Sequence, residues 1–213
     1  MKKPFMTKIH FIITILFSVS LVSCCPPCEP EDLGDFLLLE DTGKWFEFTD
    51  DADRTFINDL NQEDILSYSP IESGFEDLGT NCTEENNCGI CCDMFGGGYA
   101  YTELTSANLS VSFHITFKKD FRQFVPTDDP FTITDYLTIT FNNSLSCELS
   151  GLPEVNLTKS VILNGTTFTQ VFSCERDAGI NLGPSDPRAF YFTEQEGIVG
   201  FEMGNGTVWS LKK

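Results

Sequence analysis

The sequence is poor in histidine and in basic residues, and it lacks a long apolar run. It holds 2 histidines among 213 residues, and 13 lysines and arginines against 32 aspartates and glutamates. Its most apolar stretch, residues 11–22, is shorter than the roughly 20 residues that a membrane-spanning helix needs. We find no Gly-x-Ser-x-Gly elbow, phosphate-binding glycine loop, dinucleotide fingerprint or His-rich metal motif. The sequence therefore assigns no catalytic residue, no cofactor and no metal.

The first 23 residues have the layout of a secretory signal peptide. Lys2, Lys3 and Lys8 form a positive start, and the apolar run 11–22 follows. Such a segment is an export address that is removed from the mature protein. Its removal would leave 10 basic residues against 32 acidic ones, a net charge of −22. A surface of this charge repels phosphate backbones, so we expect no nucleic-acid partner.

The tetrad Leu21-Val22-Ser23-Cys24 closes the apolar run. It resembles the lipobox of bacterial lipoproteins, in which a small residue precedes an obligatory cysteine. The resemblance implies that signal peptidase II cuts before Cys24, that this cysteine carries the lipid, and that palmitate and related chains anchor the protein in a membrane. Two or three acyl chains suffice for stable anchoring. The alternative is an ordinary secretory signal whose cysteines form disulfides.

Residues 24–35 contain three prolines and several acids and almost nothing to bury, which predicts a flexible tether. Glu29, Glu31 and Asp32 resemble the acidic cluster that sends some lipoproteins of Bacteroidota to the outer face of the outer membrane. We therefore expect a lipid-anchored protein of the cell envelope, on the periplasmic or the cell-surface face of the outer membrane.

Eight cysteines remain beyond Cys24, an even number that predicts up to four disulfides in an oxidising compartment. They are Cys25, Cys28, Cys82, Cys88, Cys91, Cys92, Cys147 and Cys174. Four lie in the glycine-rich stretch 73–98, which we expect to be an irregular insertion. Zinc binding and disulfide exchange are alternatives for this group, but zinc needs reduced thiols, and the glycine run 96–98 breaks the helix that a redox motif requires.

The mature chain beyond residue 36 reads as strands. Residues 108–118 and 131–141 alternate between apolar and polar side chains, as in an antiparallel sheet with one solvated side. Asp135 falls in the apolar row, where a bulge, a strand edge or a bound cation should relieve its charge, and we favour the bulge. Residues 36–39 and 44–49 suggest a hairpin, whereas 54–66 suits either a helix or a strand and a turn.

Asn164-Gly165 is a strong hairpin signal between residues 155–163 and 166–174. Extending that hairpin places Cys147 two strands from Cys174, which at sheet spacing separates their Cα atoms by about 9.6 Å. The Cα atoms of a disulfide lie only roughly 4.4 to 6.8 Å apart. We nevertheless expect these two cysteines to pair, because they are alone in the C-terminal half. The expectation requires a bend or bulge at Cys147.

Residues 189–211 read as three strands and resemble the closing segment of small lipoproteins of Bacteroidota, a resemblance that brings no known activity. Trp209 and Phe201 are the expected core anchors there. We thus predict an all-β fold over 36–213, a single antiparallel β-sandwich or flattened barrel of ten to twelve strands, stapled by disulfides.

For function, we expect a non-enzymatic interaction or ligand-binding module with a protein or glycan partner. A glycan-acting enzyme or accessory protein and a calcium-stabilised structural domain are the alternatives. His114 lies on a polar row, where we expect a surface residue. A deep cleft with two carboxylates roughly 5 to 9 Å apart would favour the enzyme, and exposed aromatics in one flat patch would favour the binding module.

Overall fold

The computed structural model describes residues 32–50, 53–84, 90–120, 134–152, 155–177 and 179–213. Within these ranges only the backbone is described at 32–36, 46–47, 49–50, 77–84, 90–95 and 120. Contacts divide the chain into two units, one of residues 1–34 and 77–96 and one of residues 35–76 and 97–213. The larger unit contains the surface and the buried pair discussed below.

The described residues form fourteen strands and one 3₁₀ helix, in agreement with the predicted all-β class. In chain order they are β1 (Asp32–Phe36), η1 (Glu40–Asp50), β2 (Asp53–Asn58), β3 (Glu63–Tyr68), β4 (Glu72–Glu84), β5 (Ile90–Ser106), β6 (Val111–Asp120), β7 (Thr134–Phe141), β8 (Leu145–Leu152), β9 (Val161–Leu163), β10 (Thr166–Phe168), β11 (Phe172–Glu175), β12 (Pro187–Thr193), β13 (Gly197–Met203) and β14 (Val208–Leu211).

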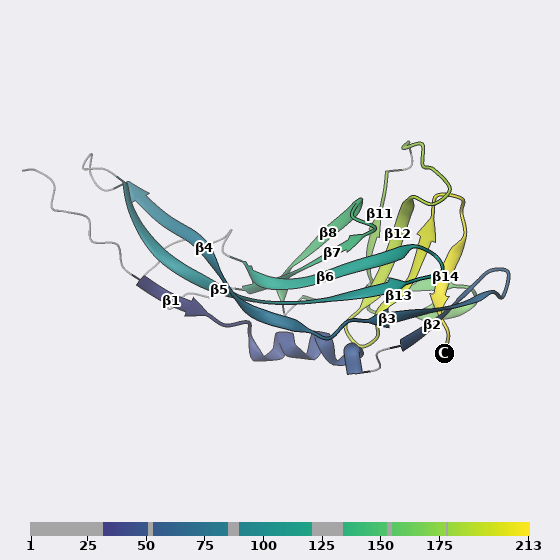
Figure 1. Cartoon of the computed structure of the whole chain (residues 1–213), viewed down its shortest axis with the longest axis horizontal. Helices are drawn as coiled ribbons and strands as arrows, with labels where there is room; N and C mark the ends of the chain where they lie inside the picture. The colour runs from purple at the N-terminus through teal and green to yellow at the C-terminus, as the bar shows by residue number, and fades with distance from the viewer. Residues whose placement is uncertain (1–31, 51–52, 85–89, 121–133, 153–154, 178) are drawn as a thin grey trace, which may run out of the picture. The chain divides into compact units, whose positions relative to one another are not determined.

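Most strands belong to one antiparallel sheet that curls into a nearly closed barrel (Figure 1). Its order is β11-β12-β13-β14-β2-β3-β5-β6-β7-β8, and β1 and β4 also pair with β5. A separate two-stranded sheet consists of β9 and β10. The predicted flattened barrel is confirmed, with more strands than the ten to twelve expected because the chain includes several strands of three or four residues.

Phenylalanine rings fill the inside of the barrel. Phe113 and Phe141, on the neighbouring strands β6 and β7, stack with centroids 4.3 Å apart, and Phe201 of β13 meets both edge to face at 5.6 and 5.5 Å. All three are fully buried. Trp209 stacks on Phe201 at 6.2 Å, which confirms these two residues as core anchors. Offset and edge-to-face packing of this kind adds to the stability gained from burial alone.

The alternating rows of β6 and β7 explain why this core forms. Side chains at 111, 113, 115 and 117 are buried, as are those at 137, 139 and 141, while the residues between them are half-buried on the other side. The two strands pair without a register shift from Phe113 opposite Phe141 to Asp120 opposite Thr134. The prediction for residues 131–133 lies outside the described residues.

A disulfide between Cys147 and Cys174 joins β8 to β11, with Cα atoms 6.0 Å apart. These strands are the two ends of the barrel sheet, so the bond closes the seam between them. The pairing agrees with the prediction, but the required bend does not occur, since Cys147 pairs in register with Ile139 of β7. The error came from extending the hairpin, because Cys174 pairs with Phe190 of β12.

The hairpin at Asn164-Gly165 is present but short. Both residues have positive φ, 46° and 82°, as a type I′ turn requires. Pairing begins with Leu163 opposite Thr166 and ends at Val161 opposite Phe168. Gln170 then adopts a φ of 53°, and the chain enters β11 of the larger sheet rather than continuing the hairpin to Val155.

Two further expectations are corrected. Residues 40–50 form the helix η1 instead of a hairpin turning at Asp41-Thr42-Gly43. Trp45 and Phe48, three residues apart, share one side of a 3₁₀ helix and pack on Phe192 at 6.2 and 5.6 Å. Most of residues 73–98 lie in β4 and β5 rather than in an irregular insertion, since backbone pairing does not depend on the side chains that glycine lacks. Residues 54–66 resolve to strand, turn and strand.

Asp135 keeps its place in the apolar row and is fully buried. The predicted bulge exists, but it lies on the partner strand: Asp135 pairs with Leu152 and Tyr136 with Ser150, so Gly151 is the extra residue, with a φ of 86°. The bulge therefore does not bring the carboxylate to solvent. Its charge is met instead by Lys119 of β6, whose Nζ lies 2.8 Å from Oδ1, with both side chains almost fully buried.

Removing the Cys147–Cys174 bond should destabilise the fold, because the seam then opens more readily. A loop of this size, with 27 residues of sequence separation, predicts a loss of about 3 to 4 kcal/mol in the free energy of unfolding. Chemical denaturation of the Cys147→Ala and Cys174→Ala variants measures this loss of unfolding free energy. The double variant should lose no more than either single variant, since all three remove one bond; additive losses would contradict a role for the bond itself.

Candidate functional site

The cysteines singled out from the sequence fall into three groups. Cys24, Cys25, Cys28 and Cys88 lie outside the described residues. Cys82, Cys91 and Cys92 lie on β4 and β5 at positions whose side chains are outside the description. Cys147 and Cys174 form the seam disulfide. Among the described residues there is no group of three or more histidine, cysteine, aspartate or glutamate side chains that could hold a metal ion.

The most distinctive surface is the outward side of β5, β6 and β7, which we call the β5–β7 face. Its members are polar or aromatic and alternate with buried residues along each strand. They are Tyr99, Tyr101, Glu103, Ser112, His114, Thr116, Lys118, Tyr136, Thr138 and Thr140.

The register brings these side chains into straight rows across the sheet. Tyr101 lies opposite Thr116, which lies opposite Thr138, and Glu103 lies opposite His114, which lies opposite Thr140. Neither strand pair has a register shift across these rows. Bulges twist and bend a sheet, so their absence at these positions keeps the face regular.

Three aromatic rings lie side by side on this face. Tyr99 and Tyr101, two residues apart on β5, stack with centroids 6.3 Å apart, and Tyr101 meets the His114 ring at 5.3 Å. All three are only partly buried. A row of tyrosine and histidine rings on an open sheet offers both apolar area and polar edges, a combination typical of contact surfaces.

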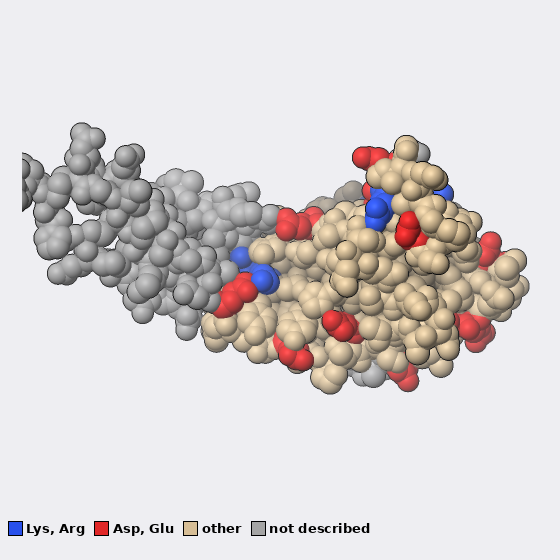
Figure 2. Space-filling view, turned by 45° about the horizontal axis from the view of Figure 1, so that its top comes forward, with Lys and Arg blue, Asp and Glu red and all other residues tan. Residues whose placement is uncertain are grey.

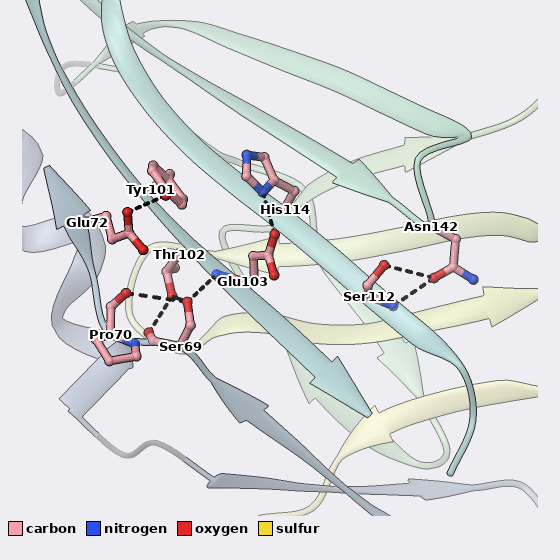
Figure 3. A network of polar contacts seen from close by, with 9 residues as sticks. All are labelled: Ser69, Pro70, Glu72, Tyr101, Thr102, Glu103, Ser112, His114 and Asn142. Carbon is pink, nitrogen blue, oxygen red and sulfur yellow. Dashed lines mark hydrogen bonds and ion pairs between the residues drawn. The ribbon is translucent and has the colours of Figure 1, made fainter. Parts of the chain in front are cut away.

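Hydrogen bonds hold the side chains of the face in place (Figure 3). His114 Nδ1 lies 3.2 Å from Glu103 Oε1, and the Tyr101 hydroxyl donates to Glu72 of β4. Near the start of β6, the Ser112 backbone amide donates to Asn142 Oδ1 at 2.7 Å. The side chains of Tyr101, Glu103 and His114 are thus held in place before any partner arrives, which lowers the entropy cost of binding.

The edge of the face is tied to β3 by a second set of bonds, also seen in Figure 3. The buried Thr102 hydroxyl donates to the Ser69 carbonyl at 2.8 Å, and the Glu103 amide donates to Ser69 Oγ at 2.9 Å. These bonds continue the link between β3 and β5 where their ladder, two residue pairs long, has ended. They keep the strand that carries the tyrosines aligned with the barrel.

Both charged side chains of the β5–β7 face, Glu103 and Lys118, have partners. Lys118 pairs with Glu76 of β4 at 2.7 Å, and His114 contacts Glu103. Figure 2 shows acidic side chains scattered over the molecule in that view with few basic ones among them. The hydrogen bond to Glu72, together with neighbouring negative charge, raises the pKa of Tyr101 above its ordinary value.

Two cavities open elsewhere in the described part of the larger unit. One of about 130 Å³ is lined by Trp45, Phe168 and a set of amides, hydroxyls and the Glu196–Lys213 ion pair. The other, of about 250 Å³, lies beside Arg176 and Arg188. Binding sites for small organic molecules usually measure about 300 to 1,000 Å³, so both are small for that purpose.

Comparisons of this chain with family models, curated proteins and solved structures found no match. No helix among the described residues is long and apolar enough to cross a membrane.

Sequence reasoning found His114 but missed the tyrosines beside it. The signal was present, since Tyr99, Tyr101 and Glu103 alternate with Ala100, Thr102 and Leu104 in the period of a strand. It also missed Lys119, which continues the apolar row of β6 by the same period. The contacts of Tyr101 with Glu72 and His114 depend on which strands are neighbours, and that information is not local.

Replacing Glu72 by glutamine should lower the pKa of Tyr101 toward its ordinary value, because the substitution removes both the strongest acceptor of its hydroxyl and a nearby charge. The raised pKa also means that this hydrogen bond contributes fully at neutral pH and is lost as Tyr101 ionises in alkaline solution. NMR titration of ring-labelled tyrosine measures the change. Glu103→Gln is the matched control and should shift Tyr101 less, since Glu103 acts through charge alone.

Proposed function

We propose that this protein is a cell-envelope lipoprotein whose β domain is a non-enzymatic binding module, with the β5–β7 face as its contact surface. The observation that carries the proposal is the row of Tyr99, Tyr101 and His114 rings on the regular outer side of the barrel, where hydrogen bonds hold Tyr101 and His114 in place. Partly exposed aromatic rings gathered on one polar face are typical of interaction sites.

The chemistry of the face favours an extended partner over a small molecule. Its rings are flanked by the hydroxyls of Thr116, Thr138 and Thr140, which can donate and accept. A glycan or a protein surface offers matching hydroxyls, amides and apolar faces, and the rows of side chains on the β5–β7 face can contact several of them at once. The described cavities, at about 130 and 250 Å³, are too small to bury a drug-sized ligand.

The position of His114 supports a binding role over a catalytic one. Its side chain is 44% exposed and lies on the outer side of the barrel beside Glu103, which is 52% exposed. Active sites are usually concave and exclude water, because electrostatic stabilisation of a reacting group is strong only in such surroundings.

Truncating Tyr101 should weaken partner binding while leaving the fold intact. We expect Tyr101→Ala to weaken binding by about 10- to 100-fold, in the range of aromatic anchors at interfaces. The measurement is a titration, by biolayer interferometry, of the partner that the wild-type chain selects from glycan and envelope-protein arrays.

Two matched variants sharpen this test. Tyr101→Phe keeps the ring and removes the bond to Glu72, so it should retain most of the affinity if stacking dominates. Ile162→Ala changes an apolar side chain of β9 that is 71% exposed and should bind like the wild type. Equal losses in Ile162→Ala and Tyr101→Ala would place the contact surface elsewhere.

The anchor is proposed from the lipobox resemblance, with Cys24 as the lipidated residue. Cells fed a palmitate analogue should label the wild-type chain, and a Cys24→Ala variant should lose the label and leave the membrane fraction. Cys147→Ala is the control, because it removes a cysteine that is already in a disulfide. Undiminished labelling of Cys24→Ala, or a Cys24 thiol found bonded to another cysteine, would refute the anchor.

A further inference from the structure

We propose that Lys119 and Asp135 are joined by an intramolecular amide bond that the fold itself promotes, so that β6 and β7 are covalently cross-linked inside the barrel. The proposal does not depend on the β5–β7 face or on the anchor. It rests on the geometry and burial of four groups in the larger unit.

The two side chains meet in an almost dry site. Lys119 and Asp135 lie directly opposite each other on β6 and β7, and their side chains are 3% and 0% exposed. Nζ lies 2.8 Å from Oδ1, yet the contact does not have the angles of a hydrogen bond, and Oδ1 accepts none from any other described residue. A buried ion pair without good hydrogen bonds gains too little to offset its loss of hydration.

The other carboxylate oxygen has two donors aimed at it. The Leu39 amide donates to Oδ2 at 2.8 Å, and the Thr42 hydroxyl donates to the same atom at 2.5 Å. Leu39 immediately precedes η1 and Thr42 lies in its first turn, and the buried Trp45 and Phe48 hold this helix against the barrel. Two fixed donors on one oxygen are the arrangement that stabilises the oxyanion of an acyl-transfer intermediate.

The reaction is a condensation with balanced atoms and charges. A proton first passes from the Lys119 ammonium to Oδ1, which leaves an amine beside a carboxylic acid. The amine lone pair attacks Cγ, and the carbonyl electrons move to Oδ2, where the two donors stabilise them. A second proton passes from nitrogen to Oδ1, the Cγ–Oδ1 bond breaks, and this oxygen leaves as water. The new Nζ–Cγ amide is neutral, so the buried charges disappear.

Burial separates this pair from the other lysine–carboxylate pairs among the described residues. Lys118–Glu76 and Lys212–Glu63 are as close, at 2.7 and 2.6 Å, but their side chains are about one third and one half exposed. Water solvates those charges and competes with attack. For Lys119 and Asp135, fixed proximity in a dry site corresponds to an effective concentration of about 10⁵ to 10⁸ M.

Peptide mapping by mass spectrometry tests the proposal on the full chain, reduced and alkylated before digestion with trypsin. Trypsin cleaves after Lys118 and Arg122 but not after a Lys119 whose Nζ is blocked by an amide bond, so the cross-linked chain yields residues 119–122 joined to the next tryptic peptide, 123–159, which contains Asp135. We expect the two to be recovered as one branched species about 18 Da below their summed mass, the loss of one water. Cleavage after Lys119, together with recovery of peptide 123–159 at its unmodified mass, would overturn the proposal. Lys118 and Glu76 provide an internal control and should remain unmodified.

Variants identify the atoms involved. Lys119→Arg keeps the positive charge but cannot form the amide, and a branched species surviving in it would overturn the assignment. Thr42→Ala should slow cross-linking by about 100-fold in a pulse-chase experiment, as expected for the loss of one oxyanion donor, whereas Thr42→Ser should keep the wild-type rate. Equal rates in these two variants would show that Thr42 does not stabilise the intermediate. The peptide map of the wild-type chain decides the main question even if a variant fails to fold.

Discussion

The closure of the barrel seam by the Cys147–Cys174 bond is the constraint on which the rest of the larger unit depends. The sheet begins at β11 and ends at β8, and these strands are far apart along the strand order. Their meeting encloses the phenylalanine core, of which Phe113, Phe141 and Phe201 are the centre. A sheet left open at this point would expose that core and two strand edges to water.

The regularity of β5, β6 and β7 follows from the same closure. These strands lie near one end of the strand order, and their inner side chains pack against rings contributed by the C-terminal strands, among them Phe190 and Phe201. With one side anchored in this way, the outer side can present hydroxyls and aromatic rings in fixed rows. Stability and the candidate contact surface therefore use opposite sides of the same three strands.

Local patterns predicted the local features well. The alternation of β6 and β7, the Asn164-Gly165 turn and the anchors Phe201 and Trp209 all depend on residues close in sequence, and the structure confirms them. The helix η1 was missed because Trp45 and Phe48 suit either a strand or a 3₁₀ turn, and only their contact with Phe192 decides between them.

Likewise, the burial of Asp135 could be predicted from its place in the apolar row, but its pairing with Lys119 depends on the register of two strands. The tyrosine row was visible in the sequence as a period of two, whereas its hydrogen bonds to β3 and β4 were not.

The stapled seam also limits how another chain can attach to the barrel. Many β proteins recruit partners by letting a foreign strand extend an open edge, a mode that relies on main-chain hydrogen bonds and tolerates many sequences. At β8 and β11 the bond between Cys147 and Cys174 holds the two edges against each other and obstructs such an addition. Recognition at this seam is thereby left to side chains, which discriminate between partners, and runaway strand-to-strand assembly is blocked there.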